Sequence, residues 1–384
     1  MAEALAGADR PAWWQSAVAA TADLGIFLPI AVMLVVVNGL SATAVLVCAG
    51  LLYLLVAFVY RVPVPVQPMK AMTALAIASE LPAPVIAAGA LTIGALFVLL
   101  GLTGLLDRLA PLVPLAVVRG VQLAVGLALA KVAYGLVAHP AAAFTAPPSP
   151  LVTAVGAAVL VAVFVRWPRA GLALAMAAAV VVVAVSTPDG TTWGPAAVDL
   201  PELTLESFGL AAVLLVVPQA PLTVTSSCIA TADAARHYFG PRAGRVRTGR
   251  LALTVGAGNL LSGLAAGMPM CHGSGGVSAH HRFGGRIGST PAIAGAGLLV
   301  VGVVLGADFA RRAGAFPIPV LVALLVTAAL WHVRLLASLR RRRDWVIALA
   351  VGGGSLVVNL GVLVVLAMVT WWAVPALRRS PTMR

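Results

Sequence analysis

The stretch from Pro63 to Met72 places one lysine in otherwise apolar sequence, directly after a run of prolines. Proline biases the residue before it toward extended backbone, so we expect a strand-like segment that ends at Gln67. Pro68 suits the first position of a helix, which we expect to run to about Ser79. Lys70 would then lie in the first helical turn, where a cation opposes the helix dipole by about 0.3–1 kcal/mol. This conflict predicts an anion beside Lys70, with the Gln67 amide as a second donor.

A second stretch, from Gly267 to Gly276, opens another short helix that we expect to end near His281. Glycine allows a ligand to approach the backbone closely, and successive N–H groups can form an anion cradle. The alternative is close helix packing by small residues, which is common in membranes. The residues assigned to this cradle are Gly273, Ser274, Gly275 and Gly276.

Cys271 and His272 lie beside Met268 and Met270, and such soft side chains suit Cu(I). Adjacent side chains on one backbone rarely converge on one ion, so we expect no metal. We interpret Cys271 and His272 as part of the substrate site, with a packed histidine as the alternative. Residues 280–282 (His-His-Arg) are interpreted as a solvated helix end.

Further polar candidates lie within two long apolar runs. Pro218–Pro221 interrupts one run, and beside it Gln219, Thr223 and Ser226 are candidates to complete the pocket. Their alternative role is hydrogen bonding to their own helix backbone. Asp23 lies in the first apolar run, where a carboxylate is a candidate for coupling to a proton or sodium, or for pairing with a cation.

The composition explains why these polar residues stand out. The chain has 384 residues, of which 61% are hydrophobic and 10% charged, and its mean hydropathy is +1.05. Soluble domains carry about 25% charged residues. We therefore expect an all-α integral membrane protein, in which Lys70 could instead extend to the interface and Gln67 could cap local backbone.

The net charge of +13 would suggest nucleic acid in a soluble protein, but most arginines lie between apolar runs. The preference of Lys and Arg for cytoplasmic loops explains them better. No signal-peptide pattern is present, so the first span is expected to be retained as a signal anchor. Cys48, Cys228 and Cys271 have no paired spacing, which argues against a disulfide framework or structural zinc.

About fourteen membrane segments fit the apolar runs. They are about 15–37, 40–60, 68–79, 84–105, 112–136, 149–165, 170–186, 208–232, 251–266, 267–281, 290–307, 317–336, 345–356 and 358–374. The expected organisation is a cytoplasmic arm (1–12), a first repeat (13–186), an extracytoplasmic acidic loop (187–206), a second repeat (207–375) and a cytoplasmic tail (376–384), with no C-terminal regulatory domain. Both termini then lie in the cytoplasm, with the arginine-rich loops.

The two short helices recur at a regular interval. Pro65 and Pro269 are 204 residues apart, and each follows a full span and precedes a short helix. Two halves of seven segments each must have opposite orientation in the membrane, which makes an inverted repeat. Interrupted segments at matching positions mark the midplane site of many transporters. Both helix N-termini would then face one anion.

Four segments carry a resemblance to a known family: Asp23–Pro29, Pro65–Ala71, Pro218–Thr223 and Gly267–Gly276. Together they resemble the molybdate transporter family related to the sulfate permeases. The resemblance implies a seven-plus-seven fold with core and gate domains, and uptake of molybdate or a similar oxyanion. Sulfate permeases proper usually carry a C-terminal regulatory domain, whereas this chain ends about ten residues after its last span.

The expected function is secondary active transport of molybdate or a related tetrahedral oxyanion by alternating access in the plasma or inner membrane. No GxxxxGK[ST] motif is present, so we expect no ATP hydrolysis. The alternatives are a sulfate or other anion permease and, from another class, a membrane-embedded enzyme that uses Asp23 or His272. The sequence lacks a nucleophile–base–carboxylate set for such an enzyme. Expected partners are the oxyanion, the bilayer, a co-transported proton or sodium and a second copy in a homodimer; no nucleic acid or cofactor is expected.

Overall fold

The computed structural model describes residues 13–379 apart from 110–111, 143, 145–146, 168–170, 172–174, 176–177, 180, 184 and 186–189. The expected arm 1–12, most of the expected segment 170–186 and the end of the tail lie outside the described residues. Within them the chain is mainly helical. Five helices are long and apolar enough to cross a membrane, or six if the bent pair α15 and α16 forms one span. The expected fourteen segments remain a prediction.

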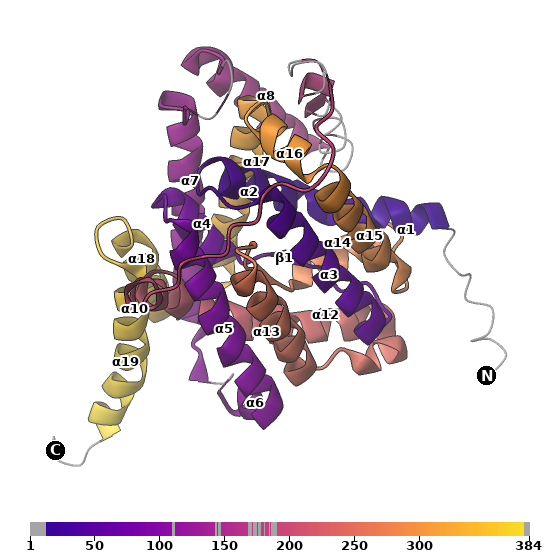
Figure 1. Ribbon diagram of the computed structural model, residues 1–384. Helices are drawn as coiled ribbons and strands as arrows, with labels where there is room; N and C mark the ends of the chain where they lie inside the picture. The colour runs from indigo at the N-terminus through magenta and orange to yellow at the C-terminus, as the bar shows by residue number, and fades with distance from the viewer. Residues whose placement is uncertain are drawn as a thin grey trace.

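A short antiparallel ribbon lies at the centre of the molecule (Figure 1). Its strands are β1 (Gln67–Pro68) and β2 (Met270–Cys271), with Gln67 opposite Cys271 and Pro68 opposite Met270. Pro68 has no N–H to donate to the ribbon. The side chain of Asn259 compensates, since its Nδ2 donates to the Met270 carbonyl at 2.6 Å and its Oδ1 accepts the Met270 N–H at 2.9 Å.

Each strand leads into one of the two short helices, α4 (Lys70–Ala78) and α14 (Ser274–Arg282). Because the strands are antiparallel, the helices leave the ribbon on opposite sides and both helix N-termini lie next to it (Figure 1). The expectation that Pro68 begins the first short helix is wrong by two residues. Pro68 belongs to the ribbon, and Met69 donates its N–H to the Pro269 carbonyl at 2.9 Å before the helix starts.

The remaining helices follow the expected apolar runs. In the first half they are α1 (Trp13–Ala20), α2 (Leu24–Val36), α3 (Ala42–Tyr60), α5 (Ala83–Thr103), α6 (Leu105–Leu109), α7 (Leu115–Ala138) and α8 (Pro150–Arg166). In the second half they are α10 (Leu205–Ala211), α11 (Val217–Leu222), α12 (Ala230–Phe239), α13 (Thr248–Leu264), α15 (Ser289–Val304), α16 (Gly306–Ala313), α17 (Ile318–Arg334), α18 (Arg342–Gly354) and α19 (Leu360–Arg379). A 3₁₀ turn, Thr21–Asp23, joins α1 to α2.

The expected interruption at Pro218–Pro221 is not a break in the helix. The chain remains helical from Leu205 to Phe239, with π-helical stretches at Ala212–Val216 and Thr223–Ile229 on either side of α11. A proline removes a backbone donor and crowds the preceding turn, and π geometry is one way to accommodate it without ending the helix. The polar residues of this stretch therefore lie on one continuous helical segment.

The long helices pack in two groups. In one group α13 packs on α5, and α3 packs on α15; a Cβ placed on Gly50 would lie 2.8 Å from the Gly295 carbonyl oxygen. In the other group α7 packs against α17 and α18, and α17 also contacts α8. Helix α2 contacts both α3 and α17 and so joins the groups, and α4 contacts α7. The central ribbon and α4 both contact α2 and thus lie next to the boundary between the groups.

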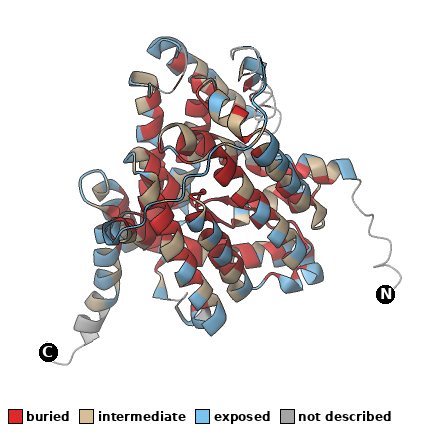
Figure 2. Cartoon of the chain, viewed as in Figure 1, coloured by how far each residue is buried: buried red, intermediate tan, exposed pale blue. Residues whose placement is uncertain are grey.

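The distribution of buried residues matches this arrangement of helices around the central ribbon. Buried residues concentrate around the central ribbon, whereas exposed positions lie on the outer helix faces (Figure 2). Many of those outer positions are large and apolar, such as Phe58 at 76% exposed and Leu151 at 73%. A broad apolar exterior is the surface that a bilayer requires. The fold is therefore that of a helical membrane protein with its most buried polar groups near the centre.

Candidate functional site

Lys70 is the first residue of α4, and its ammonium group reaches toward the start of α14. Its Nζ lies 3.9 Å from the position that a Cβ on Gly273 would occupy. Among the described residues, no hydrogen bond or ion pair of Lys70 is seen, and its side chain is partly exposed. The ribbon therefore brings a cation from the first half of the chain to the helix N-terminus of the second half.

The first turn of α14 is open. Gly273 precedes the helix, and within the described residues the backbone N–H groups of Ser274, Gly275 and Gly276 donate to no protein acceptor. Gly275 is exposed and a Cβ there would meet nothing within 4 Å, whereas Gly273 and Gly276 are buried. The free N–H groups and the helix dipole favour an anion at this point.

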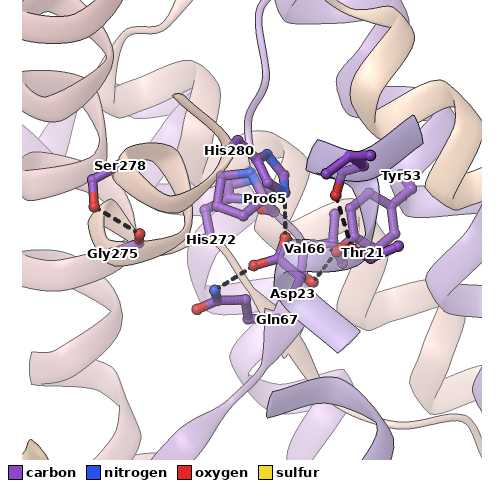
Figure 3. Close-up of polar contacts among 11 residues, drawn as sticks. Thr21, Asp23, Tyr53, Pro65, Val66, Gln67, His272, Gly275, Ser278 and His280 are labelled. Carbon is purple, nitrogen blue, oxygen red and sulfur yellow. Dashed lines mark hydrogen bonds and ion pairs between the residues drawn. The ribbon is translucent and has the colours of Figure 1, made fainter. Parts of the chain in front are cut away.

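Gln67 packs its amide directly against that first turn. A Cβ on Gly273 would lie 2.6 Å from Gln67 Oε1, and a Cβ on Gly276 would lie 2.6 Å from Nε2. Gln67 is 2% exposed, and its Nε2 donates to Asp23 Oδ1 at 2.7 Å (Figure 3). Its Oε1 has no hydrogen-bond partner among the described residues. The amide thus donates to a carboxylate rather than toward the expected anion.

Asp23 is the centre of a buried polar cluster (Figure 3). Tyr53 on α3 donates its hydroxyl to Asp23 Oδ2 at 2.9 Å and also reaches the Val66 carbonyl at 2.8 Å. His280 on α14 places Nε2 2.9 Å from the same carboxylate oxygen. The interpretation of His280 as part of a solvated helix end is wrong, because its side chain is fully buried. The cluster links the turn between α1 and α2 to α3, β1 and α14.

Gln219 and Thr223 support α4 rather than line an open site. Gln219 Oε1 accepts the backbone N–H groups of Ala71 at 3.0 Å and Met72 at 3.1 Å. Its Nε2 donates to the hydroxyl of Thr223 at 3.0 Å, which in turn donates to the Gln219 carbonyl at 3.1 Å. Both side chains are buried. The N-terminus of α4 is therefore capped by protein while that of α14 is open.

The other predicted residues differ in their surroundings. His272 is buried, with Nδ1 2.9 Å from the Pro65 carbonyl and Nε2 2.8 Å from the Thr254 hydroxyl. Both ring nitrogens of His272 thus have hydrogen-bond partners within the protein. Cys271 is buried with its sulfur 3.6 Å from the Pro68 carbonyl, and Ser226 is partly buried within a π-helical stretch. No group of three or more potential metal ligands occurs among the described residues.

Sequence reasoning missed three residues that build this region: Tyr53, Asn259 and His280. Tyr53 and Asn259 are polar residues within long apolar helices, and a buried polar group needs a partner. That signal would have singled them out, although not their partners. His280 was masked by the neighbouring His281 and Arg282, which make the helix end look solvated.

The arrangement is that of a helical membrane protein in which two short helices begin at a central two-stranded ribbon. The chain matches the family model described as "Molybdate transporter of MFS superfamily" over residues 15–129 and 211–331. It belongs to this molybdate transporter family. Molybdate transporter 2 of Arabidopsis thaliana is 29% identical over 81% of this chain and 76% of its own length. Molybdate transporter 1 of the same plant is 30% identical over 80% and 76%, respectively.

Solved structures with low sequence identity share the fold. The transmembrane domain of the cyanobacterial bicarbonate transporter BicA has a TM-score of 0.65 at 18% identity, covering 93% of this chain and 96% of that one. Murine Slc26a9, an anion transporter solved in the inward-facing state, has a TM-score of 0.70 at 13% identity, covering 95% and 68%. The family and fold indicate a transporter rather than an enzyme.

Proposed function

We propose that this protein transports molybdate or a related tetrahedral oxyanion across the membrane. The observation that carries the proposal is the ammonium group of Lys70 beside the open first turn of α14. Lys70 supplies a full positive charge, and Ser274, Gly275 and Gly276 supply backbone donors. The names of the two plant relatives support molybdate as the substrate.

The geometry favours an anion in a specific way. Lys70 is costly at a helix N-terminus in a low-dielectric centre, and a bound dianion would offset both its charge and the dipole of α14. The anion would lie on the α14 side of the ribbon, because Gln219 already occupies the donors of α4. Cys271, Ser226 and His272 would lie around the bound anion.

A seven-plus-seven inverted repeat with fourteen segments is the arrangement that we propose for the whole chain. The equivalent places of α4 and α14 after β1 and β2 support it. The helices around α3, α5, α13 and α15 would form the core domain, and those around α7, α17 and α18 the gate. Alternating access would follow from movement of one group against the other, with the anion held near their boundary.

The proposed setting is the plasma or inner membrane, with both chain termini in the cytoplasm. The arginine-rich segments 236–250 and 334–343 would face the cytoplasm, and the acidic residues Asp199 and Glu202 the outside. Asp23 is the proposed coupling residue, since it is a buried carboxylate that contacts Gln67 on β1 and His280 on α14. A homodimer is compatible with this arrangement.

Uptake of radiolabelled molybdate into proteoliposomes tests the proposal. We expect uptake that saturates, requires the protein and increases when an inward proton gradient is imposed. Unlabelled tungstate and sulfate, added in separate competition series, rank the oxyanions, because helix dipoles alone discriminate poorly between tetrahedral dianions. Sulfate as the stronger competitor would assign the site to the alternative, a sulfate permease. Absence of vectorial uptake of any of the three would contradict the transport proposal.

A further inference from the structure

Gln67 presents an acceptor where the proposed anion would bind. Its Oε1 is buried, has no partner among the described residues and lies 2.6 Å from the Cβ position of Gly273. The same position is 3.9 Å from Lys70 Nζ. An oxyanion held by Lys70 and the first turn of α14 would therefore meet the Gln67 carbonyl oxygen, and two acceptors repel each other.

The orientation of this amide is set by Asp23. Ionised Asp23 can only accept hydrogen bonds, so the Gln67 NH₂ group must face it, as observed at 2.7 Å. Protonated Asp23 can donate instead. The Gln67 amide could then turn over, accept the Asp23 O–H with Oε1 and direct its NH₂ group at the anion. The two ends of an amide are nearly equal in size, so this reversal needs no repacking.

We propose that Gln67 is a proton-dependent donor for the oxyanion: one proton taken up at Asp23 reverses the Gln67 amide and converts it from a repelling acceptor into a donor. The proton comes from water on the side from which the anion enters and returns to water with the anion's release. By linkage, the bound anion favours protonated Asp23 as much as the proton favours the anion. This inference rests on the proposed function and gives it a co-transported proton.

The groups around Asp23 determine whether acidification strengthens or weakens anion binding. His280 faces it from α14, Tyr53 from α3 and Cys271 from β2. A proton placed on His280 would instead hold Asp23 ionised by its charge and keep the Gln67 acceptor toward the anion. In that case acidification would weaken anion binding. The proposal therefore requires that the added proton reside on Asp23, with affinity rising as the pH falls.

Calorimetric titration of molybdate into the purified full-length protein tests this directly. Repeating the titration in buffers of different ionisation enthalpy gives the net number of protons taken up per anion bound. We expect uptake approaching one proton, and a Kd that rises by up to about tenfold per pH unit between about pH 6.5 and 8. Binding without proton uptake, or with net proton release, would overturn the inference. Failure to bind molybdate at any pH would instead refute the proposed function.

Two variants distinguish the proton-dependent reversal of the Gln67 amide from a purely structural role of the Asp23–Gln67 contact. Asp23→Asn keeps a donor toward Gln67, so affinity should become independent of pH; Gln67→Met cannot reverse, so proton uptake should be lost there too. The control is Asp233→Asn, which removes an exposed carboxylate paired with Arg236 and should keep the wild-type proton count. Wild-type proton uptake in Gln67→Met would contradict the inference. The wild-type titration decides the question even if a variant fails to fold.

Discussion

The side chain of Gln219 completes the first turn of a helix to which it does not belong: its Oε1 accepts the backbone N–H of Ala71 at 3.0 Å. The same oxygen accepts the N–H of Met72. A side chain from the long segment Leu205–Phe239 thus takes the place that an anion would occupy at the start of α4. The two short helices are equivalent in their position after the ribbon but different in what their N-termini can bind.

This relationship predicts that Gln219 stabilises the fold. Gln219→Met would leave two buried N–H groups without partners, at a cost of about 1–3 kcal/mol for an unsatisfied group. We expect a lower unfolding temperature in detergent. Thr225→Val on the same helical segment is the control, because within the described part of the chain its hydroxyl bonds only the Pro221 carbonyl of its own helical segment. Equal unfolding temperatures for the two variants would refute the capping role.

Gly273 and Gly275 offer a matched pair at the open helix. Gly273→Ala would place a Cβ 2.6 Å from Gln67 Oε1, so the amide or the strand must shift. Gly275→Ala meets nothing within 4 Å and replaces glycine by a better helix former, worth up to about 1 kcal/mol. Thermal unfolding of both variants checks the packing. We expect Gly273→Ala to destabilise the protein and Gly275→Ala to leave it at least as stable.

The same pair also separates close packing from anion binding. If the glycines serve only helix packing, Gly273→Ala should lose stability, but its molybdate affinity, measured on the folded fraction, should equal that of the wild type. If the cradle binds the anion, Gly273→Ala should lose affinity even where the protein remains folded, because Gln67 is displaced toward the ligand. An unstable Gly275→Ala would contradict the open space at that position.

Much of this fold follows from local sequence patterns. The long apolar runs predicted α3, α5, α7, α13 and α17, since a bilayer restricts such runs to helices. The prolines before Gln67 correctly predicted a non-helical segment there, but the strand itself covers only Gln67 and Pro68. They could not indicate that Pro68 pairs with Met270, because strand pairing depends on residues about two hundred positions away. Likewise Pro218–Pro221 suggested a break, but π-helical turns keep that segment helical.

The charged residue and the glycines of the candidate site could be predicted from the sequence, but the hydrogen-bond partners of its polar residues could not. Lys70 and the glycines around Gly273 stand out by composition, and the structure brings them together. Gln219 and Thr223 were expected to line the pocket, yet they bond α4 and each other. The sequence could not distinguish a residue that lines the pocket from one that supports α4. The amide of a glutamine can accept a backbone N–H with its oxygen or donate to an oxyanion with its nitrogen. The partners of Asp23 come from three separate segments, which no local pattern joins.

The central claim is that Lys70 binds the oxyanion, and the chain contains a natural control in its other lysine. Lys131 on α7 is exposed and, among the described residues, donates only to the Ala78 carbonyl, at 3.3 Å. Loss of a hydrogen bond to a charged group costs about 1.5–3 kcal/mol, or roughly 10- to 100-fold in Kd.

The most direct measurement is the molybdate Kd of purified Lys70→Gln and Lys131→Gln, each checked for folding by its unfolding temperature. We predict that Lys70→Gln weakens binding at least about tenfold with its fold retained, while Lys131→Gln binds as the wild type does. A folded Lys70→Gln protein with wild-type molybdate affinity would contradict the account.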